Sequence, residues 1–495
     1  MYHAKLYING EFRLSGDKKS TPSIDPATGE IVATVEWPSK NDLDLAVDSA
    51  VLALNSDWKK RSQEDRAKLI LAISDKIKEK KENFIELEMK DSGSVLKKAK
   101  ADIFNTISYF KILSGMAKNL KFLEKDESTS RIGFSVNYRS YQPVGVCGQI
   151  IPWNFPLVMA AWKIGPVLAT GCTTVLKSAI ETPATAALLA EILQEVGVPK
   201  GVVNIVTGDA EIGKYLVGHP KINKIAFTGS TAVGKEIVAS SAKTLKRTTM
   251  ELGGKSPNII LADADLTAAV DGALYAFLYH QGQACDSGTR LLVHQNIYKS
   301  FIDLFLKRIK EIKIGTTNDP AVGFGPLINE KQFKTVMSYI QKSKSEGAKL
   351  LYGGERITGG HFDKGFFIAP TAFEITPDHT IWHEEIFGPV VGITSFSNDQ
   401  EAIKLANLTS YGLAAAVWSK DHEHAKKIAD ELDAGTIWIN EYHLLSPAMP
   451  FGGLKESGLG REMGKEGLMN YLEVKHLWES DCDERIKKPW FDTLF

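Results

Sequence analysis

Apolar positions in the first quarter of the chain recur with a helical period. The pattern opens at residue 42 and continues in segments to residue 120, and residues 64–81 place many Lys and Glu side chains on the opposite face. Spacing of three to four residues gathers apolar side chains into one stripe that packs on a core, while the charged face stays in water. Residues 42–120 are therefore predicted to form amphipathic helices.

From residue 144 the pattern changes to short apolar runs that alternate with helical segments. Strand-type runs cover residues 144–151, 173–177, 201–206 and 224–228, and an apolar helix follows the first of them. A further helix is expected to open with Thr182 as N-cap and Pro183 as first residue, and to end near Gly197. Such alternation is typical of an α/β fold whose parallel sheet binds ligands at the carboxyl ends of its strands.

The same alternation restarts at residue 257, with a strand over residues 258–261 and a helix over residues 266–279. Two units are thus predicted, one from residues 1–122 and 144–253 and the other from residues 254–456. Residues 123–143 and 471–495 fit neither unit. Residues 135–141 alternate like an exposed strand, and an exposed ribbon needs a partner to be stable.

The composition, with 43% hydrophobic and 24% charged residues among 495, is that of a globular protein with large cores. The 59 basic and 60 acidic residues nearly cancel, which argues against nucleic acid as a partner. The longest apolar region, residues 155–169, contains Lys163 and is too short to span a bilayer. The N-terminus lacks the apolar stretch of a signal peptide, so no membrane partner and a cytoplasmic location are expected.

Four cysteines occur in the chain, Cys147, Cys172, Cys285 and Cys482. None has metal-ligand spacing, so no metal site is expected, and their small number suits a reducing compartment. Cys285 has a polar setting, since Gly282 precedes it and Asp286 follows it. An isolated cysteine is more often a small buried hydrophobe, but a polar turn after a helix favours an exposed and reactive thiol.

Two further polar residues follow predicted strands. Glu251 ends a strand-like run and precedes Gly253 and Gly254, which allow the backbone to approach a ligand closely. A single carboxylate more often lies on a solvated face, so this pattern alone leaves a structural and a functional interpretation open. Asn154 follows the first strand, either as an ordinary turn residue or as an amide donor to an oxyanion.

Residues 227–236 (FTGSTAVGKE) follow a strand and open a helix, whose free N–H groups suit a phosphate. The segment nearly matches the P-loop pattern, but Glu236 stands where that pattern needs a hydroxyl for Mg²⁺. The sequence therefore predicts a nucleotide site and disfavours a P-loop NTPase.

Taken together, these segments resemble the aldehyde dehydrogenase superfamily of the hydrolytic, non-phosphorylating kind. The resemblance covers nearly the whole chain and rests on PWNFP at 152–156, FTGS at 227–230, MELGGK at 250–255, GQAC at 282–285, EEIFGP at 384–389 and PFGGLKESG at 450–458. It implies a Rossmann-like nucleotide-binding domain for the first unit and an α/β catalytic domain for the second. The two remaining segments would form a small β oligomerisation ribbon of a homodimer or homotetramer.

The resemblance also implies residue roles. Cys285 would be the nucleophile, Glu251 the general base for deacylation, and Asn154 an oxyanion donor together with the Cys285 N–H. Positions expected to bind NAD and/or NADP are Ile151, Trp153, Lys177, Ser178, Ile180, Gly229, Ser230, Leu252, Gln332, Glu385 and Phe387. Positions expected to line a substrate tunnel are Phe155, Met159, Trp162, Tyr279, Leu445 and Phe451.

The chain departs from the family pattern at the cofactor. NAD-preferring members often carry a glutamate where Ile180 stands, and an acid there would repel a 2′-phosphate. Ile180 removes that repulsion and Ser178 is a candidate donor to the phosphate, so NADP is expected to be accepted alongside NAD.

The chain also departs from the family pattern at positions expected to contact the substrate. Residues 438–443 resemble betaine-aldehyde enzymes, which hold a quaternary ammonium in an aromatic box, but Leu445 stands where a box aromatic is expected. An apolar, aromatic or long-chain aldehyde is therefore expected. A betaine aldehyde or other amino aldehyde, and a catalytically silent binding relative, are the alternatives.

Two residues beside the nucleophile are unusual. Asp286 is expected to raise the pKa of the Cys285 thiol, because a neighbouring negative charge disfavours the thiolate. His280 is interpreted as a residue at the end of the helix near the tunnel, in preference to an acid–base group.

Overall fold

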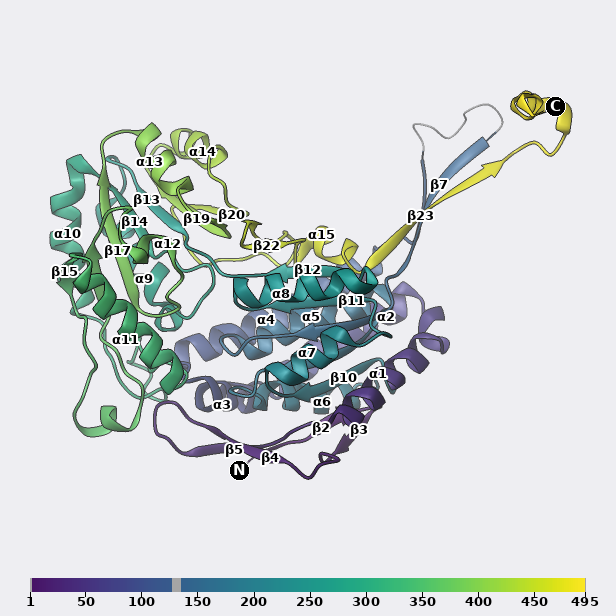
Figure 1. Ribbon diagram of the computed structural model, residues 1–495, viewed down its shortest axis with the longest axis horizontal. Helices are drawn as coiled ribbons and strands as arrows, with labels where there is room; N and C mark the ends of the chain where they lie inside the picture. Colours follow the sequence, from purple (N-terminus) through teal and green to yellow (C-terminus); the bar gives the residue numbers. More distant parts are fainter. Residues whose placement is uncertain (1, 127–134, 495) are drawn as a thin grey trace.

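The computed structural model describes residues 2–126 and 135–494 and has a mixed α/β fold, as predicted (Figure 1). Four helices occupy the first segment, α1 (Lys40–Leu54), α2 (Gln63–Glu79), α3 (Lys81–Ser92) and α4 (Leu96–Lys118). Ser39 caps α1, where its hydroxyl accepts from the Asp42 N–H and the Asp42 carboxylate accepts from the Ser39 N–H. The helices predicted over residues 42–120 are confirmed.

The larger sheet has eight strands in the order β22-β12-β11-β8-β9-β10-β2-β3. Its parallel centre consists of β8 (Val146–Ile150), β9 (Thr173–Ser178), β10 (Val203–Thr207), β11 (Lys224–Thr228) and β12 (Arg247–Glu251). Antiparallel strands at the edges are β2 (Leu6–Ile8), β3 (Glu11–Arg13) and β22 (Gly458–Leu459). The four strands predicted over residues 144–228 are all present.

Helices cover both faces of this sheet. On one face α1 packs with α7 (Ala210–Gly218) and α8 (Thr231–Ser241), and on the other α2, α3 and α4 pack with α5 (Pro156–Thr170) and α6 (Ala184–Glu195). The expected N-cap of α6 is wrong: α6 begins at Ala184, whose N–H donates to the Asp91 carboxylate at 2.7 Å. A carboxylate from α3 thus replaces the cap expected from Thr182.

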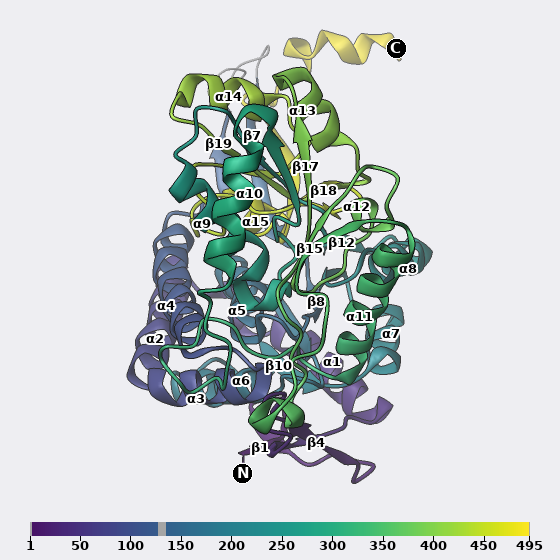
Figure 2. The same cartoon turned by 90° about the vertical axis from the view of Figure 1, so that its left-hand side faces the viewer.

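The second sheet has seven strands in the order β15-β16-β17-β14-β13-β19-β20. Its strands are β13 (Pro257–Ile260), β14 (Arg290–His294), β15 (Lys349–Tyr352), β16 (Thr371–Glu374), β17 (Val390–Phe396), β19 (Ala414–Trp418) and β20 (Thr436–Ile439). Its helices are α9 (Leu266–Leu278), α10 (Gln295–Ile309), α11 (Glu330–Ser345), α12 (Thr380–His383), α13 (Asp399–Asn407) and α14 (His422–Asp430). All pairings are parallel except that of β15 with β16, and Figure 2 shows this unit end on.

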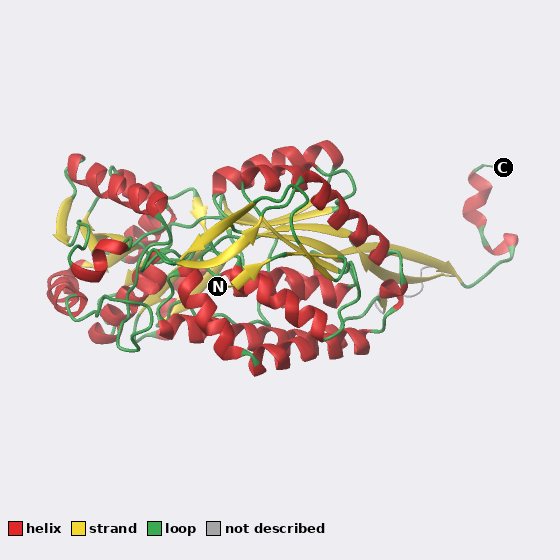
Figure 3. Cartoon of the chain, turned by 90° about the horizontal axis from the view of Figure 1, so that it is seen from below, coloured by secondary structure: helices red, strands yellow, loops and turns green. Residues whose placement is uncertain are grey.

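A three-stranded antiparallel ribbon projects from the body (Figures 1 and 3). It contains β6 (Leu123–Lys125), β7 (Ser135–Pro143) and β23 (Leu472–Ser480), and two short 3₁₀ turns follow at Arg485–Lys487 and Pro489–Thr493. The strand predicted over residues 135–141 is therefore present, and it pairs with β23 of the same chain. Residues 127–134 of the predicted ribbon lie outside the described residues.

The remaining strands are short. β1 (Tyr2–Ala4), β4 (Ser20–Ile24) and β5 (Ile31–Glu36) form a small N-terminal sheet, and β18 (Tyr411–Gly412) pairs with β21 (Leu454–Lys455). Helix α15 (Gly464–Met469) precedes β23, and 3₁₀ turns occur at Asp57–Lys60, Ala242–Thr244, Tyr279–Gly282 and Gly360–Lys364. Among residues 2–126 and 135–494, no helix is both long and apolar enough to cross a membrane.

Candidate active site

The carboxyl ends of four neighbouring parallel strands bring the predicted polar residues to one edge of the larger sheet. Glu251 ends β12, Gly229 follows β11, Asn154 follows β8, and Lys177 lies near the end of β9. These strands are hydrogen-bonded neighbours in the order β12-β11-β8-β9. The edge therefore has the position at which parallel sheets bind ligands.

Cys285 reaches this edge from the other unit on a strained loop. His280, Gln281 and Gly282 have φ angles of +51°, +59° and +71°, which are costly for the two residues that carry a side chain. Gly282 is required here, because a Cβ atom would lie 2.2 Å from the Gly388 carbonyl oxygen. The strained turn directs the segment after α9 back towards the larger sheet.

Two hydrogen bonds through Gln283 fix the loop. The Asn154 amide Nδ2 donates to the Gln283 carbonyl at 2.8 Å, and the Ile328 N–H donates to the Gln283 side-chain oxygen at 3.0 Å. Asn154 is thus buried and bound two residues from the thiol. An amide nitrogen carries two N–H groups, so this bond leaves a second N–H for another acceptor.

A cavity of about 250 Å³ lies between the two units. Cys285 and Glu251 both line it, on walls that come from different sheets. The six residues predicted for the tunnel line the same cavity, namely Phe155, Met159, Trp162, Tyr279, Leu445 and Phe451. The sequence positions expected to act on a substrate therefore share one space.

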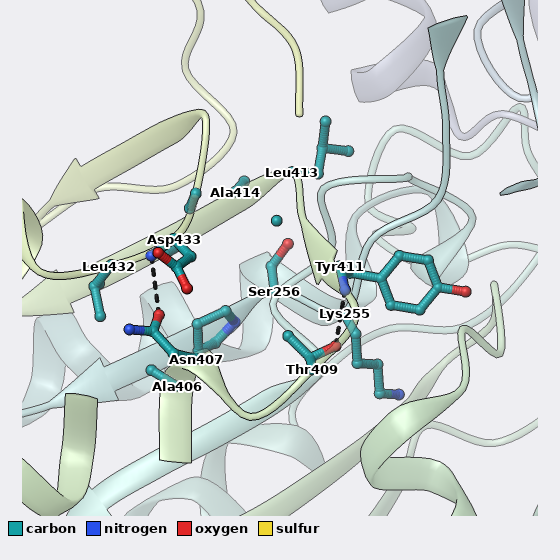
Figure 4. Close-up of a pocket in the computed structure, with 14 residues that line it drawn as sticks. Lys255, Ser256, Ala406, Asn407, Thr409, Tyr411, Leu413, Ala414, Leu432 and Asp433 are labelled. Carbon is teal, nitrogen blue, oxygen red and sulfur yellow. Dashed lines mark hydrogen bonds between the residues drawn. The ribbon is translucent and has the colours of Figure 1, made fainter. Parts of the chain in front are cut away.

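A second pocket is too small for a substrate. It lies between the start of β13 and the loops that flank β19, and Lys255, Ser256, Asn407 and Tyr411 are among its walls (Figure 4). It encloses about 10 Å³, which is room for about one water molecule. The cavity at Cys285 is the candidate active site, because it brings together the predicted nucleophile, base and tunnel residues.

The Cys285 thiol lies among acidic groups. Burial raises the pKa of the Cys285 thiol well above its ordinary value, and the carboxylates of Asp286, Glu385 and Glu251 raise this pKa further. Asp286 contributes the most of these three carboxylates, in agreement with the expectation from sequence. The thiol needs a compensating positive charge before it can act as a thiolate at neutral pH.

Glu251 is buried, and within the described residues neither of its carboxylate oxygens has a hydrogen-bond partner. Burial raises the pKa of Glu251 well above its ordinary value, and the nearby Glu462 carboxylate adds to the rise. Lys163 opposes it from α5, where its ammonium pairs with Glu462 and donates to the Thr228 hydroxyl at 2.8 Å. A carboxyl group with a raised pKa and free oxygens is suited to general base catalysis.

The sequence did not identify Lys163 and Glu462 as parts of the site. Lys163 is completely buried, and its side chain reaches Glu462, which is 299 positions away in the chain. A lysine inside the apolar run of residues 155–169 was the available signal, because a buried ammonium needs an anionic partner.

The glycine pair after Glu251 makes room for two neighbours. A Cβ atom on Gly253 would lie 2.3 Å from the Glu385 carboxylate, and one on Gly254 would lie 2.4 Å from the Cys285 carbonyl oxygen. Glu385 accepts a hydrogen bond from the Gly254 N–H at 3.2 Å. The pair therefore brings the nucleophile loop and Glu385 against the end of β12.

The predicted cofactor residues near the pyrophosphate position lie around the start of α8. Ser230 is the N-cap of α8, and within the described chain its side chain makes no capping bond. Gly229 packs under Phe227, where a Cβ atom would lie 2.4 Å from the ring. Leu252 is buried against α8, because Gly234 leaves space for its side chain. The open helix start has the N–H groups that bind a phosphate.

The predicted cofactor residues on and after β9 differ in burial and in hydrogen bonding. The Lys177 ammonium donates to the carbonyls of Gly208 at 2.5 Å and Ser178 at 3.3 Å, and burial lowers the pKa of Lys177 to about 8. Ser178 is fully buried with its hydroxyl 2.6 Å from the Thr207 hydroxyl, while Ile180 is partly exposed in the loop before α6. Ile180 is therefore the more accessible of these two positions, and the Ser178 hydroxyl is already engaged.

The other predicted cofactor residues come from both units. Trp153 and Phe387 meet edge to face with ring centroids 5.3 Å apart. Phe387 has a φ angle of +56°, and Gln332 holds this segment by donating to the Ile386 and Phe387 carbonyls at 3.1 and 2.8 Å. Ile151 is buried, and its N–H donates to the Lys177 carbonyl at 3.1 Å, which leaves its side chain a packing role.

Comparison with known proteins identifies the family. The model of the aldehyde dehydrogenase family matches residues 13–477. The chain belongs to the aldehyde dehydrogenase family. It is 42% identical over 482 residues to a mitochondrial aldehyde dehydrogenase of Mesocricetus auratus, covering 95% of this chain and 94% of the relative. It is 40% identical over 492 residues to a peroxisomal aminoaldehyde dehydrogenase of Pisum sativum, covering 98% and 97%.

A solved structure supports the same conclusion. The betaine aldehyde dehydrogenase of Staphylococcus aureus in complex with NAD⁺ is 39% identical, has a TM-score of 0.95, and covers 98% of this chain and 96% of its own. In the present aldehyde dehydrogenase, the uncapped start of α8, the buried Lys177 ammonium and the Glu385 carboxyl group fit an anionic ligand rich in hydroxyl groups. Burial raises the pKa of Glu385 to about 7. A hydroxyl group of a ligand that donates to this carboxyl group would stabilise its ionised form.

The glycine pair provides a test of the loop position in this aldehyde dehydrogenase. Gly254→Ala is expected to lower kcat by about 10- to 100-fold, because the added methyl group displaces the backbone of Cys285. Steady-state formation of reduced cofactor measures the loss. Gly115→Ala in α4 is the matched control, since its Cβ atom would meet nothing within 4 Å. Full activity in Gly254→Ala would show that the loop tolerates the shift.

Proposed function

We propose that this protein oxidises an aldehyde to a carboxylic acid with NAD or NADP, through a covalent intermediate on Cys285. The observation that carries the proposal is the shared cavity, in which the Cys285 thiol and the Glu251 carboxyl group face one space of about 250 Å³. Asn154 is bound to the same loop through Gln283. A nucleophile, an oxyanion donor and a base are the groups that an acyl-enzyme reaction needs.

The first stage forms and oxidises a thiohemiacetal. The Cys285 thiolate attacks the aldehyde carbon, and the carbonyl oxygen becomes an oxyanion that the second Asn154 N–H and the Cys285 backbone N–H stabilise. One such donor typically lowers the barrier by roughly 3–4 kcal/mol. When bound, NAD(P) supplies a nicotinamide ring that accepts a hydride from this adduct. The residues of the chain hold the adduct and exclude water from it.

The second stage releases the acid. Glu251 removes a proton from a water molecule, which attacks the thioester carbonyl and frees the Cys285 thiolate. Lys163, paired with Glu462, lies behind Glu251 and favours its ionised form. The family members that transfer the acyl group to coenzyme A lack a glutamate at this position, so Glu251 supports hydrolysis.

For the cofactor, NADP is proposed to be accepted alongside NAD. Ile180 is partly exposed at the end of β9 and presents no negative charge to a 2′-phosphate. Ile180→Glu is expected to lower kcat/KM for NADP at least about tenfold and to change that for NAD little, because the new carboxylate repels the phosphate. Initial rates with each cofactor measure this. A preference of the unmodified enzyme for NAD above about a hundredfold, roughly 2.7 kcal/mol, would overturn the proposal.

The proposed substrate is an apolar, aromatic or long-chain aldehyde. Apolar and aromatic side chains form much of the cavity wall, and Leu445 takes a position where an ammonium-binding site would carry another ring. One observation favours an amino aldehyde instead: besides Glu251, the carboxyl groups of Asp102, Asp286 and Glu462 line the cavity. Each of these three has a basic side chain as its partner, namely Lys98, His443 and Lys163, which makes the apolar class the better fit.

A panel of aldehydes with both cofactors tests the function. Hexanal, benzaldehyde, 4-aminobutanal and betaine aldehyde are assayed by absorbance of the reduced nicotinamide, and the highest kcat/KM is expected for an uncharged aldehyde. A strong preference for betaine aldehyde would establish the alternative substrate class. Absence of reduced cofactor with every aldehyde would favour a catalytically silent binding relative.

A homodimer or homotetramer in the cytoplasm is also proposed. The ribbon exposes apolar side chains, with Val474 61%, Leu477 49% and Trp478 54% exposed, and a second subunit would bury them. Light scattering is expected to give about two or four times the chain mass of 54.4 kDa. A mass of one chain at micromolar concentration would contradict the assembly.

A further inference from the structure

Two consecutive residues hold Asp286, the residue that follows the nucleophile. The Tyr442 hydroxyl donates to the Asp286 backbone carbonyl at 2.8 Å, and His443 Nδ1 lies 3.2 Å from the Asp286 carboxylate oxygen Oδ2. The side chains of His443 and Asp286 are 5% and 11% exposed. The contact is therefore mostly buried, both residues line the cavity at Cys285, and the pair spans 157 positions of sequence.

Each ring nitrogen of His443 faces an oxygen. Nε2 lies 3.1 Å from the Ala276 carbonyl oxygen, which only accepts hydrogen bonds, so Nε2 is a donor. Nδ1 faces the Asp286 carboxyl group, which only accepts when it is ionised. An ionised Asp286 would therefore be matched by a ring that donates from both nitrogens, an imidazolium.

Aromatic side chains surround the His443 ring. The ring centroid of His443 lies 4.8 Å from Tyr442, 5.2 Å from Tyr279, 5.4 Å from Tyr275 and 6.3 Å from Trp438. Aromatic rings attract cations when water is excluded, so these neighbours also favour the charged ring. His443 has a φ angle of +61°, a conformation that few side chains adopt without cost. The fold thus holds the His443 ring in a strained position against the residue that follows the nucleophile.

We propose that His443 is a positioning residue for Cys285, whose imidazolium holds the Asp286 carboxylate and offsets its negative charge at the thiol. The proposal rests on the proposed function, in which Cys285 is the nucleophile. It explains how an acidic residue can follow Cys285 without preventing formation of the thiolate. Asp286 is also the largest of the carboxylate contributions that raise the pKa of the Cys285 thiol, so compensation of its charge matters most.

The other charged groups near Cys285 and His443 are the same in the unmodified enzyme and in the His443 and Asp286 variants. The thiol also faces Glu385 and Glu251, and behind Glu251 lie Glu462, Lys163 and Arg461. Around the aromatic rings that enclose His443 the charged groups are Glu441 and Asp102, and Lys98 pairs with Asp102. Substitutions at His443 and Asp286 leave all of these in place, so a shift of the thiol pKa reports on the pair.

The test is the pH dependence of Cys285 alkylation by iodoacetamide in enzyme without aldehyde or cofactor, followed by peptide mass spectrometry. His443→Asn is chosen because asparagine tolerates positive φ angles. It is expected to raise the midpoint of the alkylation rate against pH by about one pH unit. Without the positive charge of His443, the Asp286 carboxylate would disfavour the thiolate more strongly. Asp286→Asn is expected to lower the midpoint by a similar amount.

The double variant separates positioning from general disturbance. If His443 acts through Asp286, His443→Asn changes the midpoint by less than about 0.3 unit when Asp286 is already Asn. His424→Asn is the matched control, because His424 forms an equivalent pair with Asp399 at 2.7 Å in the second unit and is expected to leave the midpoint unchanged. The alkylation measurements do not depend on catalytic turnover. The proposed function is tested by a different experiment, and it would be wrong if Cys285→Ala retained activity.

An unchanged midpoint in His443→Asn, or equal shifts with and without the Asp286 carboxylate, would overturn the proposal. A midpoint that fails to fall in Asp286→Asn would also overturn it, because the carboxylate would then have no charge effect for His443 to offset.

Discussion

Cys285→Ala is expected to lower turnover roughly 10⁴-fold or more while leaving cofactor affinity unchanged. The thiol forms the only covalent bond that the proposed mechanism makes between enzyme and substrate, and loss of a catalytic nucleophile commonly has effects of this size. Alanine is smaller than cysteine and adds no contact, so the cavity wall and the Gln283 bonds that fix the loop remain. Turnover is measured by absorbance of the reduced nicotinamide, and affinity by titration of NAD and NADP.

Cys482→Ala is the matched control, because Cys482 is a buried thiol in the C-terminal segment and does not line the cavity. It is expected to keep full activity. Residual turnover of Cys285→Ala within tenfold of the unmodified enzyme would place the nucleophile elsewhere and would remove the basis of the proposed function.

The sequence predicted the elements of the site better than the contacts between them. The apolar runs of β8, β9, β10 and β11 are fully buried in the structure, and a run of that kind has few alternatives to a central parallel strand. Placement of Asn154, Lys177 and Glu251 at strand ends followed directly, because parallel strands align their carboxyl ends at one edge.

Contacts between segments far apart in the chain had no local signal. His443 meets Asp286 within the second unit. Lys163 meets Glu462 because the chain returns to the first sheet after the second unit. The left-handed turn at His280 and Gln281 was equally hidden, since two consecutive residues other than glycine rarely adopt positive φ angles. Tertiary packing sets these features, and periodicity along the chain does not record it.

Glu251→Gln is expected to lower steady-state turnover roughly 10²- to 10⁴-fold while an initial burst of reduced cofactor remains. Glutamine keeps the size of the side chain but cannot take a proton from water, so the thioester on Cys285 forms and accumulates. Rapid-mixing absorbance measures the burst, and intact-protein mass spectrometry detects the acyl group. A slow burst, rather than a slow steady state, would place the role of Glu251 before the thioester.

The same substitution has an opposite effect on stability that follows from the buried carboxyl group. The pKa of Glu251 in the folded protein is raised well above its model-peptide value of 4.5, with burial as the main cause. Between those two values the folded state binds a proton that the unfolded state has lost, so stability falls as pH rises through this window and stays lower above it. Glutamine does not ionise and escapes this loss.

Glu251→Gln is therefore expected to raise Tm by about 2–4 °C above the raised pKa and to match the unmodified enzyme below about pH 4.5. Thermal unfolding in buffers from pH 4 to pH 9 measures the difference. An equal Tm at every pH would mean that the pKa of Glu251 is the same in the folded and the unfolded protein, so that burial does not raise it. Stability and turnover thus test one property of Glu251, its ionisation inside the buried site, from opposite directions.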